Sequence, residues 1–245
     1  MSKIVFNHSC NIHTLEGPQI ALPVILEITN AKSLLDVGCG VGFWLKTALN
    51  SGISDVFGVD GVAIPSEQLL IPPTLFRQQD FTQPWNLNRR FEAALCLEVA
   101  EHLPESSAVV LIDALTSHTD CVIFSAACPG QPGQHHVNCQ WPAYWQKLFN
   151  DRGYVCTDEV RWRIWDDERI EPWYRQNIFI ARRNPEAAGR ESRLPAVIHP
   201  AINRLIAEAQ FSENMQFVAQ GRLPFFWYFR CPLMALLRKT WRKFT

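Results

Sequence analysis

The fold of this 245-residue chain follows from one stretch of its sequence, Ser33-Leu34-Leu35-Asp36-Val37-Gly38-Cys39-Gly40-Val41-Gly42-Phe43-Trp44. The apolar run from Leu34 to Val37 predicts a short buried strand, and three glycines follow that strand at alternate positions. An amphipathic helix is predicted to begin at Phe43. A strand, a glycine loop and a helix in this order bring backbone N–H groups against a nucleotide-like ligand, because glycine has no side chain to hold the ligand away.

The composition is that of an ordinary globular chain. Hydrophobic residues make up 47% of it, and the formal net charge of -1 argues against a general nucleic-acid binder. The eight cysteines form no Cys-x-x-Cys pair and no zinc-like cluster. We find no signal-peptide pattern and no apolar stretch of the roughly 18 residues that a membrane span needs. The sequence therefore predicts a cytoplasmic protein.

Strand and helix patterns alternate along the chain and predict one open, largely parallel α/β sheet. After the opening unit, strands are expected at 56–60, 75–78, 91–98, 121–126, 154–160 and 176–181, and helices at 18–29, 101–117 and 142–152. Because only 161–175 separate the last two strands, we expect them to be an antiparallel pair. Ligands of such sheets lie beyond the carboxyl ends of the strands, where Asp36, Asp60, Asp80, Glu98 and the loop 128–138 would meet.

The chain is predicted to hold one catalytic-type domain and an extension. Residues 1–183 form the domain, and the helix at 18–29 either covers the ligand pocket as an N-terminal lid or simply packs on the sheet. Residues 184–245 are expected to be a linker followed by a helical extension. Its end, 221–245, carries six Lys and Arg residues, many aromatic residues and no acidic residue. Such a segment is predicted either to contact an anionic membrane surface or a partner, or to pack on its own domain.

The glycines and carboxylates favour S-adenosylmethionine over a dinucleotide. The dinucleotide fingerprint needs a glycine where Phe43 stands, and no Gly-Lys-Ser/Thr of a phosphate-binding loop follows. Asp36 inside the loop would repel a pyrophosphate but suits a ligand that carries an ammonium and a sulfonium group. Asp60, about 20 residues further on, is placed to accept hydrogen bonds from ribose hydroxyls, and the pair Asp80-Phe81 suits an adenine.

With these motifs the chain resembles the class I S-adenosylmethionine-dependent methyltransferases from Leu34 to about Arg182. Three blocks carry the resemblance: Leu35-Asp36-Val37-Gly38-Cys39-Gly40 with Gly42, then Gly58-Val59-Asp60-Gly61, then Leu97-Glu98-Val99-Ala100-Glu101-His102-Leu103. The resemblance implies a Rossmann-like, seven-stranded sheet, mostly parallel with its last strand antiparallel, and helices on both faces. It also implies cofactor contacts at Asp36, Gly38, Cys39, Gly40, Asp60, Gly61, Asp80, Phe81 and Leu97.

A narrower resemblance is to a bacterial branch of these enzymes with a His-Val/Ile-Asn-Glu-Gln-Trp loop. It covers Phe124 through Trp145 and Trp173 to Asn177, and Cys139 stands where that loop has its glutamate. We also expect substrate contacts at Asn138, Gln140, Trp141 and Tyr174.

Methyl transfer is an in-line displacement in which positioning does much of the work, and a general base helps when the acceptor is a hydroxyl. His136 is our first candidate for that base, because it lies in a polar loop at the expected mouth of the site. Glu98 and His102 are the other candidates. The alternatives are a loop hydrogen bond for His136 and a helix-start role for His102. The pair His135-His136 is a poor metal site by its spacing, so no metal is expected.

The leading hypothesis is an O-methyltransferase that acts on a small polar molecule or a glycan. The alternatives are an N-methyltransferase acting on an amino sugar, and a non-catalytic S-adenosylmethionine-binding module that docks a partner or a membrane. An NAD-dependent oxidoreductase is disfavoured by Phe43 and by the absence of a plausible Tyr-x-x-x-Lys hydride site.

Overall fold

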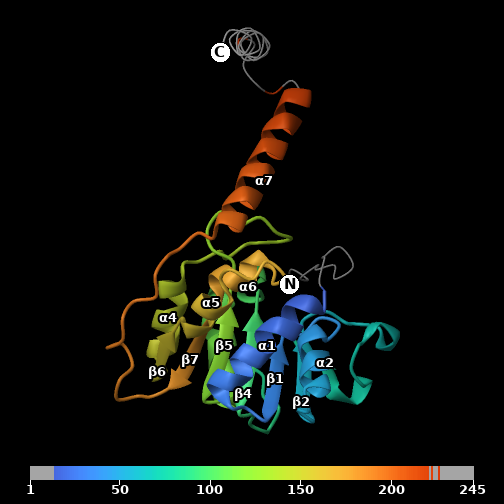
Figure 1. Cartoon of the computed structure of the whole chain (residues 1–245), viewed down its shortest axis with the longest axis vertical. Coiled ribbons are helices and arrows are strands. Elements are labelled where there is room, and N and C mark those ends of the chain that lie inside the picture. Colours follow the sequence, from blue (N-terminus) through green and yellow to red (C-terminus); the bar gives the residue numbers. More distant parts are fainter. Residues whose placement is uncertain (1–13, 221, 223–225, 227–245) are drawn as a thin grey trace. The chain divides into compact units, whose positions relative to one another are not determined.

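A computed structural model gives the structure of the chain and describes residues 14–220, 222 and 226 (Figure 1). Seven strands form one sheet of order β3-β2-β1-β4-β5-β7-β6. They are β1 (Ser33–Val37), β2 (Asp55–Asp60), β3 (Phe76–Gln78), β4 (Ala93–Leu97), β5 (Cys121–Ser125), β6 (Tyr154–Thr157) and β7 (Phe179–Arg183). β7 pairs antiparallel with both β5 and β6, and the other pairs are parallel. The expected sheet is confirmed.

Helices cover both faces of the sheet because successive strand residues point to opposite sides. Leu34 packs into one apolar core with α1 (Glu16–Thr29), α2 (Phe43–Asn50) and α5 (Glu159–Ile164), which lie in front of the strands in Figure 1. Leu35 packs into the other core with α3 (Ala108–His118) and α4 (Pro142–Asn150). All five residues of β4 are buried, as expected for a central strand covered on both faces.

The connection between the last two strands differs from the prediction. β6 ends at Thr157, and two short helices, α5 and α6 (Pro172–Asn177), follow before β7 begins at Phe179. The predicted strands at 154–160 and 176–181 were therefore wrong at 158–160 and at 176–178. Val160 and Ile164 are four residues apart and both buried, which is the spacing of a helical stripe rather than a strand.

The predicted helix at 101–117 begins later, at Ala108. Two short 3₁₀ turns, η4 (Ala100–His102) and η5 (Glu105–Ser107), come before it. Leu103 between them has an extended backbone, because a residue that precedes a proline is disfavoured in the helical region. The polar end of β4 therefore leads into a tight turn and not directly into a long helix.

The compact unit that contains the sheet ends at Ile202, later than the predicted domain end at 183. The stretch predicted as a linker packs on this unit: Leu194 is buried, and the carboxylate of Glu191 accepts hydrogen bonds from Gln146, Asn150 and the backbone N–H of Cys156. The remaining unit, from residue 203 on, contains most of α7 (Pro200–Ala219), whose described side chains are largely exposed. The predicted membrane contact at 221–245 falls almost entirely outside the described residues.

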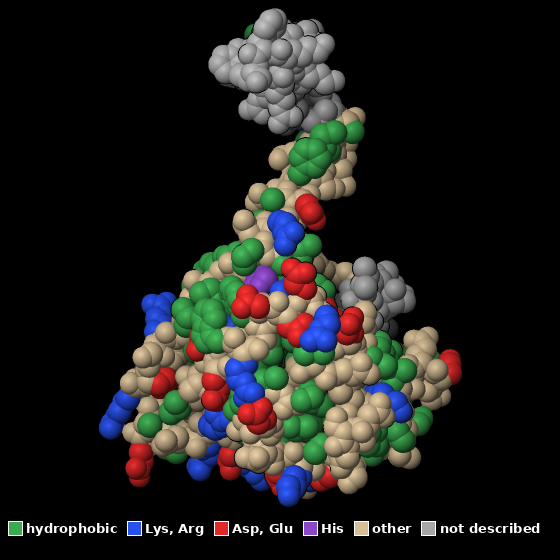
Figure 2. Space-filling model, in the orientation of Figure 1, with side chains coloured by type: hydrophobic (Ala, Val, Ile, Leu, Met, Phe, Trp, Pro, Cys, Tyr) green, Lys and Arg blue, Asp and Glu red, His purple; other side chains and the backbone are tan. Residues whose placement is uncertain are grey.

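Within the part of the chain that the structure describes, no helix is both long enough and apolar enough to span a membrane. On the face of the sheet-containing unit seen in Figure 2, acidic and basic side chains are interspersed among tan and green surface. No continuous basic patch is visible on the described residues of that face.

Candidate active site

A cavity of about 550 Å³ lies at the carboxyl ends of the parallel strands, a volume typical of small-molecule sites. Its walls come from the glycine loop, the ends of β2 and β4, the 128–141 loop and the segment around α6. Every predicted cofactor residue except Asp80 lines it: Asp36, Gly38, Cys39, Gly40, Asp60, Gly61, Phe81 and Leu97. The convergence expected from the strand order is therefore present.

The glycine loop presents bare backbone to this cavity. Gly38 and Gly40 have φ values of +82° and +53°, in the left-handed region that glycine adopts at little cost. A Cβ at Gly38 would clash with the side chain of Val99. The N–H groups of Gly38 and Cys39 both donate to the Val59 carbonyl, at 2.8 and 3.1 Å, and so tie the loop to β2.

Asp36 is a buried carboxyl at the wall of the cavity. It is 2% exposed, and its Oδ2 has no hydrogen-bond partner among the described residues. Burial raises the pKa of Asp36 to about 8, and the nearby Asp60 carboxylate adds to the effect. A buried carboxyl without a donor is costly unless a ligand supplies one, and an ammonium group fits this need best.

Asp60 holds the glycine loop and faces the same space. Its Oδ2 accepts from the N–H of Gly40 at 2.8 Å, and its Oδ1 accepts from the N–H of Val62 at 2.9 Å. A carboxylate has about four lone-pair sites, so these bonds leave capacity for ribose hydroxyls. Phe81 is buried near Gly61, as an adenine-binding ring would be.

Asp80 differs from its prediction. It is exposed and does not line the cavity. Its Oδ1 accepts from both the N–H and the hydroxyl of Thr82, at 2.8 and 2.7 Å. This is a local turn of the kind that aspartate often forms with the backbone two residues on.

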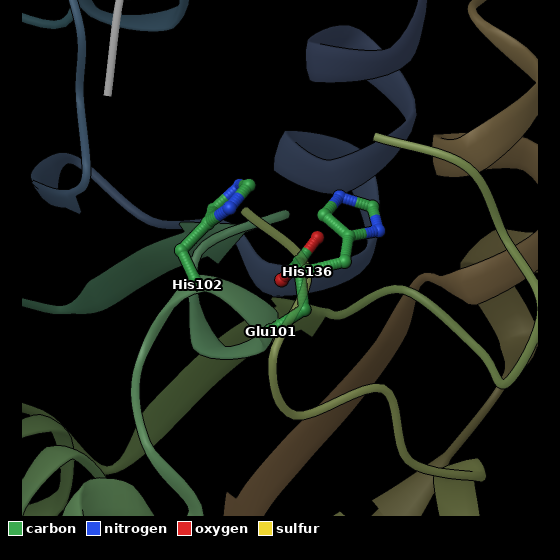
Figure 3. Close-up of side chains that lie close together, drawn as sticks. All are labelled: Glu101, His102 and His136. Carbon is green, nitrogen blue, oxygen red and sulfur yellow. The ribbon is translucent and has the colours of Figure 1, made fainter. Parts of the chain in front are cut away.

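The three predicted catalytic residues meet at another part of the same cavity, which Glu98, His102 and His136 all line. The ring centroids of His102 and His136 are 5.1 Å apart. Glu101, which the sequence pattern does not single out as a site residue, lies with them (Figure 3). One side-chain donor atom from each of Glu101, His102 and His136 falls within 4.8 Å of the other two.

Glu101 is fully buried, with 0% of its surface exposed. Neither of its carboxylate oxygens has a hydrogen-bond partner among the described residues. Burial raises the pKa of Glu101 well above its usual range, and the Glu98 carboxylate nearby raises it further. Glu101 therefore presents unused oxygen atoms at the wall of the cavity.

His136 is oriented by its own loop. Its Nδ1 lies 3.0 Å from the carbonyl oxygen of Gln131 and donates to it, which leaves Nε2 with the lone pair in the neutral imidazole. Gly133 packs against the Nε2 side of the ring, where a Cβ would clash. Burial, helped by the neighbouring His136, lowers the pKa of His102 to about 4, so His102 is neutral at physiological pH.

Glu98 is held by amides at the end of β4. Its carboxylate accepts from Gln131 Nε2 at 2.9 Å and from Asn177 Nδ2 at 3.1 Å. Its backbone φ is +56°, a left-handed conformation that a non-glycine residue adopts at some cost and that is found most often at functional sites. The side chain is thus fixed at the cavity wall by both backbone and amide contacts.

The 128–141 loop is fastened beside Glu101. The N–H groups of Val137 and Asn138 both donate to the Glu101 carbonyl, at 2.9 and 3.0 Å. These bonds place the loop, and with it His136, against η4. In the sequence, the only sign that Glu101 belongs to the site was its place in the segment Glu98-x-x-Glu101-His102 after a buried strand. The residues around Glu101 do not reveal that the loop containing His136, 35 residues later, lies beside it.

Of the predicted substrate residues, only Tyr174 lines the cavity, where it is buried and meets Trp44 edge to face at 5.4 Å. The other three do not line it. Asn138 is buried and accepts from Gln140 Nε2 at 3.1 Å, and Trp141 is partly exposed at the start of α4. These residues build the loop and do not face the space that a substrate would occupy.

Residues 20–121 match a protein family described as "Methyltransferase domain". The match begins in α1 and ends at the start of β5, so it includes the glycine loop, Asp36, Asp60 and the whole Glu98–His102 segment. No curated protein sequence matches the chain.

Solved methyltransferase structures share the fold. DesVI from Streptomyces venezuelae has a TM-score of 0.53 at 14% identity, covering 69% of this chain and 92% of that chain. CalS10, an amino pentose methyltransferase from Micromonospora echinaspora, has 0.52 at 13%, covering 71% and 93%. Magnesium protoporphyrin IX methyltransferase from Synechocystis PCC 6803 has 0.50 at 21%, covering 74% and 89%. At these identities the likeness establishes the fold alone.

Proposed function

We propose that this chain is an S-adenosylmethionine-dependent methyltransferase that methylates a hydroxyl of a small polar molecule or a glycan. The observation that carries the proposal is the buried Asp36 carboxyl, whose Oδ2 has no partner among the described residues and which borders a glycine loop with no side chains toward the ligand. A pyrophosphate is repelled by such a group, whereas an ammonium-bearing ligand satisfies it. The methyltransferase-domain match over 20–121 supports the same cofactor.

The residues present fit S-adenosylmethionine in each of its parts. Asp36 binds the ammonium group, Asp60 accepts from the ribose hydroxyls, and the buried ring of Phe81 with Leu97 encloses the adenine. When bound, this cofactor supplies a methyl group already activated on a sulfonium. The protein therefore needs only to hold the acceptor in line and to make its oxygen nucleophilic.

The acceptor is held where Glu98, His102 and His136 line the cavity. Glu98 is immobilised by Gln131 and Asn177, so it offers a fixed carboxylate that accepts hydrogen bonds from hydroxyls. His136 offers its Nε2, which carries the lone pair in the neutral tautomer that donates from Nδ1 to Gln131. Such a nitrogen either takes a proton from an acceptor hydroxyl or binds a cation. A polar cavity wall of this kind suits a hydroxylated acceptor better than an apolar one.

Calorimetry of the full chain with S-adenosylhomocysteine and with NAD tests the cofactor, and we expect binding of the first alone. Transfer of a radiolabelled methyl group to a library of sugars, glycosides, phenols and amines then tests the acceptor, with labelling of hydroxyl compounds expected. Tighter binding of NAD would overturn the proposal. Transfer to amines alone would replace it with N-methylation, and cofactor binding without transfer to any compound would leave a binding module.

A further inference from the structure

Glu101, His102 and His136 form a cluster with the features of a cation site. Their side chains converge in Figure 3, and one donor atom from each lies within 4.8 Å of the others. All three line the cavity, so a cation among them is open to a bound acceptor. The separate observation that points to a ligand is Glu101 itself, a fully buried carboxyl with no hydrogen-bond partner for either oxygen among the described residues.

The surroundings of His136 are those of a metal ligand. Histidines that bind metals donate the other ring N–H to a carbonyl or a carboxylate, which fixes the tautomer and turns the free nitrogen toward the ion. His136 does this through Nδ1 and the Gln131 carbonyl. Gly133 lies against the His136 ring. Because glycine has no Cβ, the imidazole fits in this position without a clash.

We propose that Glu101, His102 and His136 bind one divalent first-row transition-metal ion, which in turn coordinates the acceptor oxygen of the reaction proposed above. Two imidazoles and one carboxylate favour ions such as Mn²⁺, Fe²⁺, Co²⁺ or Zn²⁺ over Mg²⁺ and Ca²⁺, which prefer all-oxygen sites. Three protein ligands leave the remaining coordination positions for the acceptor and water, as in catalytic metal sites.

The geometry needs a small adjustment for this role. Bonds of about 2.0–2.2 Å to one ion place neighbouring ligand atoms about 3 Å apart, so the three side chains would draw together by roughly 1 Å on binding. The histidines are only half-buried, and His102 and His136 stand on different segments, η4 and the 128–141 loop. Rotation about their side-chain bonds is enough for this adjustment.

The step balances without a further reagent. The ion lowers the pKa of the coordinated hydroxyl, whose proton leaves to solvent. The acceptor oxygen then forms a bond to the methyl carbon while the carbon–sulfur bond breaks, and the sulfur keeps that electron pair and becomes a thioether. In this arrangement His136 acts as a ligand, and the general-base role predicted for it is not needed.

The expectation of no metal came from the pair His135-His136, whose adjacent side chains are indeed a poor chelate. The cluster instead combines two consecutive residues of η4 with one residue of a distant loop. Only the folded chain brings them together, through the two hydrogen bonds from Val137 and Asn138 to the Glu101 carbonyl.

The test is equilibrium titration of chelator-treated full-length protein with Mn²⁺, followed by electron paramagnetic resonance, and with Co²⁺, followed by its visible absorption. We expect one ion per chain, and at least about 100-fold weaker Mn²⁺ binding in His102→Ala and His136→Ala, since even outer-shell changes cost 10–100-fold. Glu101→Gln should weaken Mn²⁺ binding in the same direction. The matched control is His135→Asn, because asparagine tolerates the left-handed φ of +56° at this position. This variant should bind Mn²⁺ like the wild type.

This inference rests on the proposed function, but the two fail separately. S-adenosylhomocysteine binding by each variant reports an intact fold and cofactor site without metal. If wild-type protein binds S-adenosylhomocysteine but no Mn²⁺ or Co²⁺, or if Glu101→Gln and His136→Ala bind them as tightly as wild type, the metal site is overturned and the methyltransferase proposal stands. If the ion binds with one-to-one stoichiometry but S-adenosylhomocysteine does not, the metal site stands and the proposed function falls.

Discussion

Two sets of residues in the cavity wall, here called the cofactor end around Asp36 and the histidine end around Glu101, are built differently, although each contains a buried carboxyl with at least one oxygen that has no partner among the described residues. At the cofactor end, Asp36 belongs to a continuous strand, loop and helix, and the glycine loop lines the cavity beside it. At the histidine end, Glu101 stands on a short 3₁₀ turn, and its neighbours come from a distant loop.

This difference determines how each end responds to change. A substitution does not remove backbone groups. At the cofactor end, substitutions can therefore act on the glycines, which leave room for the ligand, and on the side chain of Asp36. The histidine end consists of side chains, each of which can be deleted singly. We therefore expect variants of the histidine end to abolish turnover while cofactor binding survives, and variants of Asp36 to weaken cofactor binding first.

The largest effect is expected for His136→Ala. Removal of the group that activates the acceptor should lower kcat by about 10²–10⁴-fold, the usual contribution of such a group. The affinity for S-adenosylhomocysteine, measured by calorimetry, should stay as in wild type because the cofactor end is untouched. A parallel loss of cofactor affinity would show that the two ends are not separable. His135→Asn again serves as the neighbouring control.

Asp36→Asn should weaken S-adenosylhomocysteine binding by about 10–100-fold, since a hydrogen bond to a charged group contributes about 1.5–3 kcal/mol. Calorimetry with methylthioadenosine, which lacks the amino-acid part, supplies the matched control. Its affinity should be the same in wild type and variant. If both ligands lose affinity equally, Asp36 acts on the loop as a whole and does not bind the ammonium group.

The free energy of unfolding of the ligand-free protein should fall as pH rises from about 4 to 8 through the contribution of Asp36. Its pKa is about 8 in the folded chain and near 3.8 when exposed, so the folded state binds more protons over this range. The slope from one such group is at most about 1.4 kcal/mol per pH unit. Urea unfolding at several pH values checks this, and Asp36→Asn should show a shallower fall than wild type.

The smallest effect is expected for Gly133→Ala, whose new methyl group would press on the His136 imidazole. We expect kcat to fall by about 10-fold, at the low end of what changes around a functional histidine cost. The double variant with His136→Ala is the control. If Gly133 acts through His136, the second substitution should add no further loss, whereas additive losses would assign Gly133 another role.

The same contrast explains what was predictable from the sequence. Asp36, Gly38 and Asp60 were assigned correctly to the cavity wall because strand ends and their loops are contiguous and follow the sheet order. Asp80 was expected at the same wall but does not line the cavity, and it accepts a hydrogen bond from Thr82 that its place in the sequence does not reveal. Asn138 was chosen as a polar loop residue, but it turns inward and supports the loop.

Glu101 was missed for a different physical reason. From the sequence, Glu101 is an acidic residue at the start of a predicted helix. Acidic residues are common and usually solvated at that position, so no functional role was expected. The 128–141 loop is bonded to the backbone carbonyl of Glu101, and the proximity of Glu101 to His136 depends on these hydrogen bonds, which span 36 and 37 residues. The hydrophobic periodicity of a segment carries no information about contacts with a distant loop. The number of hydrogen-bond partners of the Glu101 carboxylate could therefore not be predicted from the sequence.

The attachment of the 128–141 loop has a consequence for the divergence of substrate range. Two backbone N–H groups hold the loop to one backbone carbonyl, and backbone groups are present whatever the side chains are. The loop can thus accumulate substitutions, or be replaced by another of equal length, without loss of its anchor. We therefore expect side-chain changes in this loop to alter the acceptor preference of the proposed enzyme while the cofactor end keeps its structure.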